Sequence, residues 1–257
     1  MECAAYYEHL LEDPHSGVCT PAATIIEPIQ GEGGSIVPPD TYISRIAQIS
    51  AAHDVLLICD EIQAGFCRTG TYFSCEHSHT TPDIITISKA IGGGFPLSAI
   101  AYREDLDVWE KGAHIGTFRG NVVAMAAGVA TIQFMKKHSL NDHVQTIGAY
   151  LLHRLKKIAD QSDIVGDVRG RGLMLGCEMV EDTQSENPSP SLADRVRYAC
   201  YQRGLLIEIG GHYNNVARFL PPLILTRELA ETGMDIFQES IHEVEKAYKY
   251  NNENKAH

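Results

Sequence analysis

The sequence predicts an α/β architecture with a mainly parallel sheet, followed by a smaller α+β part. Strand-like and helix-like segments alternate through the first half of the chain, which is the order that a parallel sheet requires. Residues 55–59 (Val-Leu-Leu-Ile-Cys) form a continuous apolar run, typical of a buried central strand. With 257 residues, of which 44% are hydrophobic, the chain can build a sizeable core.

The first part is expected to hold four strands and a helix. Residues 23–27 are β-branched and apolar, and the apolar residues of 42–53 follow a helical spacing. The other expected strands are 55–59, 83–87 and 97–101. Glu27, Asp60 and Lys89 lie at the carboxyl ends of strands, where ligand groups gather in open α/β sheets.

The second part is expected to begin near residue 135, so that the domains are 1–135 and 136–257. Residues 121–137 combine small and apolar side chains, which predicts a long buried helix. The other expected elements are a helix at 142–158, a strand region at 165–180, a loop at 181–191, an amphipathic helix at 192–204, strands at 205–209 and 216–220, and a closing helix at 227–248.

Composition narrows the function classes. The formal net charge is −12 and no block of Lys or Arg is present, which disfavours binding to the phosphate backbone of nucleic acids. No apolar run approaches the length of a membrane span, and the first residues lack the pattern of a signal peptide. We therefore expect a cytoplasmic protein without nucleic-acid or membrane partners.

The cysteines do not predict a disulfide framework or a metal site. The chain has seven, an odd number, and no Cys-x-x-Cys pair, so they are expected to be reduced thiols. Cys59, Cys67 and Cys75 are evenly spaced, and His77 and His79 follow them. These spacings match no common zinc pattern, and we expect no metal.

Lys89 and Asp60 suggest pyridoxal phosphate chemistry. A lysine beside a glycine turn can carry the cofactor as a Schiff base, and a carboxylate at a strand end can keep the pyridine nitrogen protonated. Each residue also has an ordinary structural explanation, because a lysine near glycines is usually a solvated loop residue and an aspartate can cap a helix.

Two glycine clusters suggest nucleotide binding but fit it poorly. Gly92, Gly93 and Gly94 follow Lys89, whereas the lysine of a Walker loop comes after its glycines. Gly170-x-Gly172 approaches a dinucleotide fingerprint, but no strand of adequate length is expected to end at Gly170. We do not expect a nucleotide site.

Several motifs follow one another along the chain. They are Glu27–Gly34 (EPIQGEGG), Cys59–Phe66 (CDEIQAGF) with Arg68–Gly70, Pro82–Ile84, Ser88–Ala90, Gly116–Phe118 with Gly120–Asn121, and Arg218–Pro222 (RFLPP). In this order they resemble class III, fold-type I aminotransferases, which depend on pyridoxal 5'-phosphate. Within that class, Gly116–Asn121 and Arg203–Glu208 look most like diaminobutyrate-2-oxoglutarate aminotransferases, because most other members have a glycine where Arg119 stands here.

The resemblance implies a role for four cofactor residues. Lys89 would hold the cofactor and then move the proton between substrate and cofactor, and Asp60 would pair with the pyridinium nitrogen. Gln63 would reach the phenolic oxygen of the cofactor. Thr117 would donate its hydroxyl to the phosphate of the neighbouring subunit's site, which implies a homodimer.

The resemblance also implies a switch between Glu32 and Arg218 for binding substrates. An arginine is needed to bind the α-carboxylate of the acceptor, but it would be an unpaired charge while the distal amine of the donor reacts. Glu32 would neutralise Arg218 until 2-oxoglutarate arrives and then move aside. Together with Lys89 and Asp60, Glu32 is the expected catalytic set.

The implied reaction moves the 4-amino group of L-2,4-diaminobutyrate to 2-oxoglutarate, reversibly giving L-aspartate 4-semialdehyde and L-glutamate. Other class III reactions, on ornithine, 4-aminobutyrate or acetylornithine, stay open. Members of the class are longer, and the motifs here begin in the second half of their cofactor domain. We therefore expect either a fragment of a longer protein or a catalytically silent, truncated remnant.

Overall fold

The computed structural model describes residues 2–253 and divides into two compact units. The first comprises Met1–Ile29 and Pro38–Asn141, and the second comprises Gln30–Val37 and Asp142–His257. The sequence did not indicate that residues 30–37 belong to the second unit. The expected domain boundary near residue 135 stays a prediction for the whole protein.

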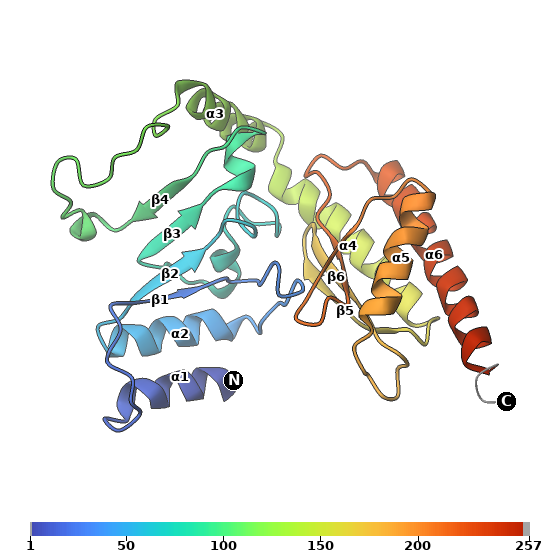
Figure 1. Ribbon diagram of the computed structural model, residues 1–257. Helices are drawn as coiled ribbons and strands as arrows, with labels where there is room; N and C mark the ends of the chain where they lie inside the picture. Colours follow the sequence, from blue (N-terminus) through green and yellow to red (C-terminus); the bar gives the residue numbers. More distant parts are fainter. Residues whose placement is uncertain (1, 254–257) are drawn as a thin grey trace. The chain divides into compact units, whose positions relative to one another are not determined.

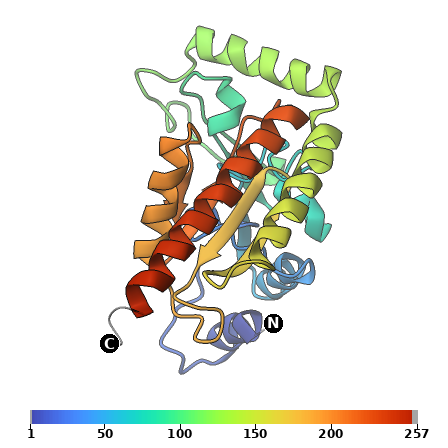
Figure 2. The same cartoon turned by 90° about the vertical axis from the view of Figure 1, so that its right-hand side faces the viewer.

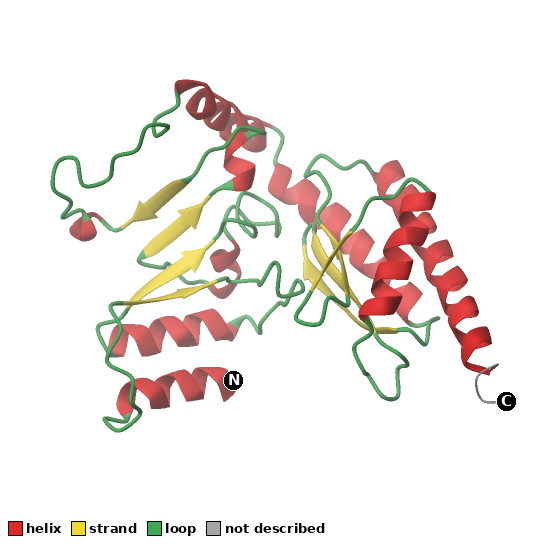
Figure 3. Cartoon of the chain, viewed as in Figure 1, coloured by secondary structure: helices red, strands yellow, loops and turns green. Residues whose placement is uncertain are grey.

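The first unit is built on a four-stranded sheet, which confirms the predicted α/β class with a mainly parallel sheet (Figures 1 and 3). Its strands, in spatial order, are β1 (Ala23–Ile26), β2 (Leu56–Asp60), β3 (Ile84–Ile87) and β4 (Ala99–Tyr102). The pairs β1–β2 and β2–β3 are parallel, whereas β3–β4 is antiparallel. A short connection containing η2 (Lys89–Gly92) allows this reversal, because only antiparallel neighbours can be joined without a long crossover.

Two helices pack on this unit. Helix α2 (Thr41–Ala52) buries Ile43, Ile46 and Ile49 in a cluster with Leu57 of β2. Helix α1 (Glu2–Glu12), which has no counterpart among the expected elements, packs on α2 and contributes Ala4 to the same cluster.

The burial predicted for the central strand is only half right. Along β2, Leu57 and Cys59 are buried, whereas Leu56, Ile58 and Asp60 are partly exposed. The continuous apolar run therefore lies on a sheet of which one face is better covered than the other. Alternate residues of a strand point to opposite faces, so an uncovered face exposes every second side chain.

Helix α3 (Val122–Lys137) forms where predicted, but the prediction that it is buried was wrong. Its exposed large apolar residues are 46–77% exposed, and they are Val122, Val123, Met125, Val129 and Phe134. The side of α3 that packs against the rest of the unit is narrow. A β-carbon at Gly128 would lie 2.8 Å from Cδ2 of Leu97, so the glycine permits the helix to approach Leu97 closely. Within residues 2–253, η2 is the main packing partner of α3.

The second unit has an antiparallel sheet covered by three helices (Figure 2). Its strands, in spatial order, are β5 (Val165–Arg171), β6 (Met174–Met179), β8 (Val216–Phe219) and β7 (Glu208–Gly210). Its helices are α4 (Leu140–Ala159), α5 (Pro190–Gln202) and α6 (Arg227–Glu253). Leu155, Leu175 and Phe237 are among the fully buried residues that join these helices to the sheet.

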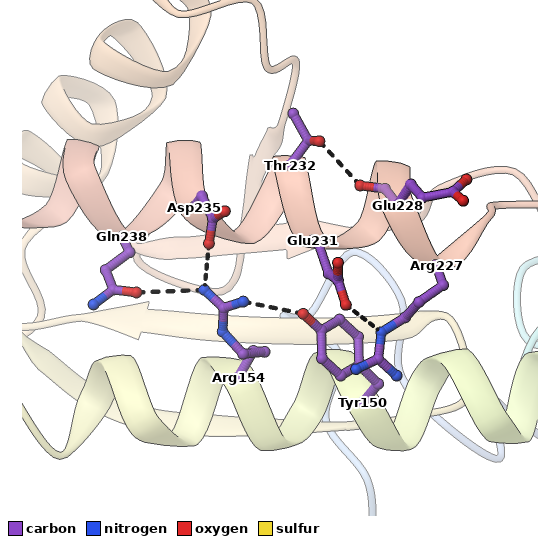
Figure 4. A network of polar contacts seen from close by, with 8 residues as sticks. All are labelled: Tyr150, Arg154, Arg227, Glu228, Glu231, Thr232, Asp235 and Gln238. Atoms are coloured by element: carbon purple, nitrogen blue, oxygen red, sulfur yellow. Dashed lines mark hydrogen bonds and ion pairs between the residues drawn. The ribbon is translucent and has the colours of Figure 1, made fainter.

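Polar contacts join α4 to α6 along one edge of this core (Figure 4). Nη2 of Arg154 donates to Oδ1 of Asp235 at 2.7 Å, and Nη1 of Arg154 donates to the hydroxyl of Tyr150 at 3.0 Å. The guanidinium of Arg227 lies 3.2 Å from the centroid of the Tyr150 ring. A cation over an aromatic face is favourable by roughly 0.5–1 kcal/mol at exposed sites, so these contacts supplement the apolar core.

The glycines at 170 and 172 lie in a hairpin. The expectation that no adequate strand ends near Gly170 was wrong, because β5 runs through Gly170 to Arg171. The chain then turns at Gly172, whose φ is +55°, into β6. A dinucleotide fingerprint requires a strand, a turn and a helix, and here a second strand follows the turn.

Within residues 2–253, no three His, Cys, Asp or Glu side chains come close enough together to hold a metal ion. In the same range, no helix combines the length and the apolar character needed to cross a membrane.

Candidate active site

Asp60 is the last residue of β2, at the edge where the carboxyl ends of β1, β2 and β3 meet. Its Oδ1 accepts the backbone N–H of Ile62 at 2.9 Å, which orients the half-buried carboxylate. Asp60 pairs in register with Thr86 of β3. This edge is the place where open parallel sheets bind their ligands.

Two polar atoms near this edge lack partners. Oε1 of Gln63 and Oγ1 of Thr86 are buried, and neither forms a hydrogen bond with any residue in the range 2–253. A buried polar group without a partner costs about 1–3 kcal/mol, so the unpaired hydroxyl of Thr86, the register partner of Asp60, is available to a ligand at this edge. The sequence analysis missed Thr86, although it is the polar residue of an otherwise apolar strand.

Glu61 anchors the segment that follows Asp60. Its side chain is buried, and its two carboxylate oxygens accept the backbone N–H groups of Ser74 and Cys75 at 2.9 and 2.8 Å. Burial raises the pKa of Glu61 above its ordinary value, although the two hydrogen bonds oppose this effect. The sequence analysis did not single out Glu61, which fixes the loop beside the strand end.

Lys89 follows β3 directly and begins η2. Its φ is +50°, in the left-handed region that residues with a β-carbon rarely adopt, and such strain is concentrated at functional sites. The preceding Ser88 donates its hydroxyl to the carbonyl of Leu97 at 3.0 Å, which holds the turn between β3 and β4. Lys89 itself is exposed.

An open cavity of about 910 Å³ lies in the first unit. Its lining residues come from the strand ends and from the exposed loop that carries Thr117, and they include Ile62, Thr86, Ser88, His114 and Thr117. Asp60, Gln63 and Lys89 do not line this cavity, although Thr86, the register partner of Asp60, does.

Arg218 and Glu32 both belong to the second unit and form an ion pair. Oε2 of Glu32 lies 2.5 Å from Nη1 of Arg218, and the arginine side chain is only 1% exposed. A second carboxylate, which the sequence analysis did not assign, contacts the same guanidinium: Oε2 of Glu208 lies 3.1 Å from Nη2. Nε and Nη1 of Arg218 are buried and neither meets the geometry of a hydrogen bond with any of the described residues, so Glu32 contacts Nη1 as an ion pair.

The backbone around Arg218 leaves room for its side chain and fixes Glu32. A β-carbon at Gly210 would lie 2.7 Å from Cδ of Arg218 and 3.2 Å from the carbonyl oxygen of Glu32. The N–H of Gly211 donates to that carbonyl at 2.9 Å. Arg169 holds the same segment, because its Nε donates to the carbonyl of Gly34 at 2.9 Å.

Comparison with known proteins identifies the family of this chain. The family model for class-III aminotransferases matches residues 2–241. The chain belongs to the class-III aminotransferase family. This family uses pyridoxal 5'-phosphate as its cofactor and acts on small molecules.

Two kinds of curated relative have similar identities. The diaminobutyrate-2-oxoglutarate aminotransferase of Haemophilus influenzae is 40% identical over 242 residues, which are 92% of this chain and 53% of that protein. The 4-aminobutyrate aminotransferase of Mycobacterium leprae is 41% identical over 219 residues, which are 84% of this chain and 48% of that protein. The chain therefore spans about half the length of these class-III aminotransferases.

Solved structures of aminotransferases share the fold. The ornithine aminotransferase of Toxoplasma gondii, described as having partial occupancy of pyridoxal phosphate at its active site, has a TM-score of 0.85 and 32% identity. The match covers 96% of this chain and 55% of that one. The fold is thus that of part of a class-III aminotransferase.

The residues at the strand ends fit this cofactor. A pyridine nitrogen needs a carboxylate partner, and Asp60 supplies one at the sheet edge. Oxygens of the cofactor need hydrogen-bond donors, and the unpaired buried hydroxyl of Thr86 can donate, whereas the unpaired Oε1 of Gln63 can only accept. Lys89 provides an exposed amine just after the carboxyl end of β3. These strand ends therefore offer a carboxylate, an amine and a buried hydroxyl to a cofactor.

Proposed function

We propose that the protein is a transaminase that moves the 4-amino group of L-2,4-diaminobutyrate to 2-oxoglutarate, reversibly giving L-aspartate 4-semialdehyde and L-glutamate. The observation that carries this proposal is the ion pair of Arg218 and Glu32. A buried guanidinium covered by an exposed carboxylate suits a reaction in which only one of the two substrates presents a carboxylate beside the reacting carbon. Diaminobutyrate aminotransferases support this choice of donor because three of them are 40% identical over 87–95% of this chain, whereas the 41% match to the 4-aminobutyrate aminotransferase covers 84% of it.

Four residues of this chain would bind the cofactor, each at a different group. Lys89 would hold the cofactor through its amine and move the proton at the substrate carbon, and Asp60 would keep the pyridine nitrogen protonated. Gln63 would donate its side-chain N–H to the phenolic oxygen, and Thr117 would donate its hydroxyl to the phosphate. When bound, pyridoxal phosphate supplies an electron sink.

Glu32 and Arg218 select which substrate binds. While the donor reacts through its distal amine, Glu32 keeps the buried charge of Arg218 neutralised. The acceptor's carboxylate then takes the place of Glu32, and a guanidinium holds a carboxylate through two parallel hydrogen bonds. The high exposure of Glu32, 77%, leaves its side chain room to move aside.

The assay uses diaminobutyrate labelled with ¹⁵N at the 4-amino group. The purified chain is supplied with pyridoxal phosphate and 2-oxoglutarate, and glutamate is collected for mass spectrometry. Label in glutamate is the expected result. Label from ornithine, 4-aminobutyrate or acetylornithine, but not from diaminobutyrate, would assign the chain to another donor, as the Mycobacterium leprae relative suggests. No transfer from any donor supports a catalytically silent chain.

We also propose that the active protein is a homodimer in the cytoplasm. The support for a dimer is that the loop of Thr117 is exposed from residue 111 to residue 120, as expected of a segment that serves another subunit's site. Sedimentation velocity of the purified chain tests this assembly, and a monomer at all concentrations would contradict it.

A further inference from the structure

Arg218 is contacted by two carboxylates, and only one of them is needed to neutralise it. Glu208 of β7 and Arg218 of β8 pair in register across the antiparallel ladder. This pairing brings Oε2 of Glu208 to 3.1 Å from Nη2, while Oε2 of Glu32 lies 2.5 Å from Nη1. With Glu32 in place, the three side chains carry a net charge of about −1 at neutral pH.

The excess negative charge faces outward. The side chain of Arg218 is 1% exposed, whereas those of Glu208 and Glu32 are 71% and 77% exposed. A solute that approaches Arg218 therefore meets the carboxylate oxygens of Glu208 and Glu32 before it meets the guanidinium.

We propose that Glu208 is a specificity residue that favours amino donors carrying a second ammonium group. This inference rests on the proposed transaminase function and deepens it. A diamino acid carries two ammonium groups and one carboxylate, whereas a monoamino acid such as 4-aminobutyrate carries one of each. The excess charge that Glu208 provides attracts the diamino acid more strongly.

Glu208 has an opposite effect on the acceptor. When a carboxylate ligand replaces Glu32, Glu208 keeps its contact with Nη2 and repels the ligand's negative charge. Removing the charge of Glu208 should therefore weaken the binding of diamino donors and strengthen that of dicarboxylates. If Glu208 only held Arg218 in place, its substitution would change the binding of diamino donors and of dicarboxylates in the same direction.

The test compares Glu208→Gln with the wild-type chain. Glutamine keeps an oxygen that can accept from Arg218 but removes the charge. The control is Glu231→Gln, because Glu231 also accepts from an arginine, Nε of Arg227 at 2.8 Å, but lies on α6. The binding of L-2,4-diaminobutyrate, 4-aminobutyrate and the unreactive dicarboxylate glutarate to the purified full chain is measured by calorimetry at low and high salt.

For Glu208→Gln we expect the dissociation constant of diaminobutyrate to rise about fivefold, the size of one exposed charge pair, with little change for 4-aminobutyrate. Glutarate should bind more tightly, and high salt should reduce both differences. Equal changes for both donors, the same shifts in Glu231→Gln, or no binding of either donor to the wild-type chain would overturn the inference.

The outcomes separate this inference from the proposed function. If the wild-type chain transfers no amino group but Glu208→Gln binds diaminobutyrate more weakly and glutarate more tightly, the proposed function is wrong and the role of Glu208 in selecting charge stands. If labelled glutamate forms but Glu208→Gln discriminates between donors as the wild type does, the function stands and the inference is wrong.

Discussion

Oε2 of Glu32 lies 2.5 Å from Nη1 of Arg218, although the two residues are far apart in the sequence. The arginine is buried on β8, and the glutamate is exposed on a segment held by the N–H of Gly211. A fixed cation with a movable anion over it is the arrangement that a site needs when it must bind a carboxylate in one half of a reaction only.

Replacing Glu32 should therefore change the choice of donor. In Glu32→Gln, Arg218 stays available to carboxylates. The kcat/KM of donors with a carboxylate beside the reacting amine, such as L-glutamate, should therefore rise relative to that of donors that react through a distal amine. We expect the ratio of the two kcat/KM values to shift by about tenfold, equivalent to ~1.4 kcal/mol. Absorbance titration with pyridoxal phosphate should show nearly unchanged cofactor affinity. An unchanged donor ratio would contradict the switch.

Gly210 should be required for the position of Arg218. In Gly210→Ala the new β-carbon would meet Cδ of Arg218 at 2.7 Å and Nη1 at 3.0 Å, so the guanidinium must shift. A misplacement of about 1 Å can weaken function by as much as about 100-fold, and we expect glutarate binding to weaken by at least about tenfold. Calorimetry measures this change.

Gly233→Ala is the matched control for Gly210→Ala. The nearest atom to its new β-carbon would be Cδ1 of Leu205 at 3.7 Å, an ordinary contact, and the residue lies within α6. Alanine in a helix should stabilise the chain by about 0.5–1 kcal/mol and leave glutarate binding unchanged. Equal effects of both substitutions on binding would show that the space at Gly210 is not what matters.

Glu61 should make stability depend on pH. Burial raises its pKa, so the folded chain holds the proton more tightly than the unfolded chain does. This contribution favours folding below the ordinary value of 4.5 and is lost as the pH rises through the folded-state pKa. The free energy of unfolding of the wild type should therefore fall, relative to Glu61→Gln, as the pH rises from 4.5 toward neutrality. Urea titrations across this range measure it, and a parallel pH dependence in both proteins would refute the assignment.

The sequence was sufficient for the fold class and the family, because strand and helix periodicities and the motif order are local properties. It placed Asp60 and Lys89 at strand ends, where the structure has them. Their catalytic roles stay predictions. The burial of α3 was predicted wrongly, since the apolar content of Val123 or Val129 does not say what covers a helix.

Residues that reach the site because their strand pairs in register with another strand could not be predicted from the sequence. Thr86 lies beside Asp60, and Glu208 faces Arg218, only because of the register of two ladders. A shift of one residue in either register would turn the side chain to the other face. No motif in the sequence records that register.

The central claim is that Lys89 is the lysine that binds pyridoxal phosphate. The most direct measurement is borohydride reduction of the chain in the presence of the cofactor, followed by peptide mapping by mass spectrometry, with Lys137→Ala as the control for loss of an exposed lysine. We predict a single cofactor-modified residue, Lys89, which persists in Lys137→Ala and is absent from Lys89→Ala. Modification of another lysine, or equal labelling of the Lys89→Ala chain, would contradict the account.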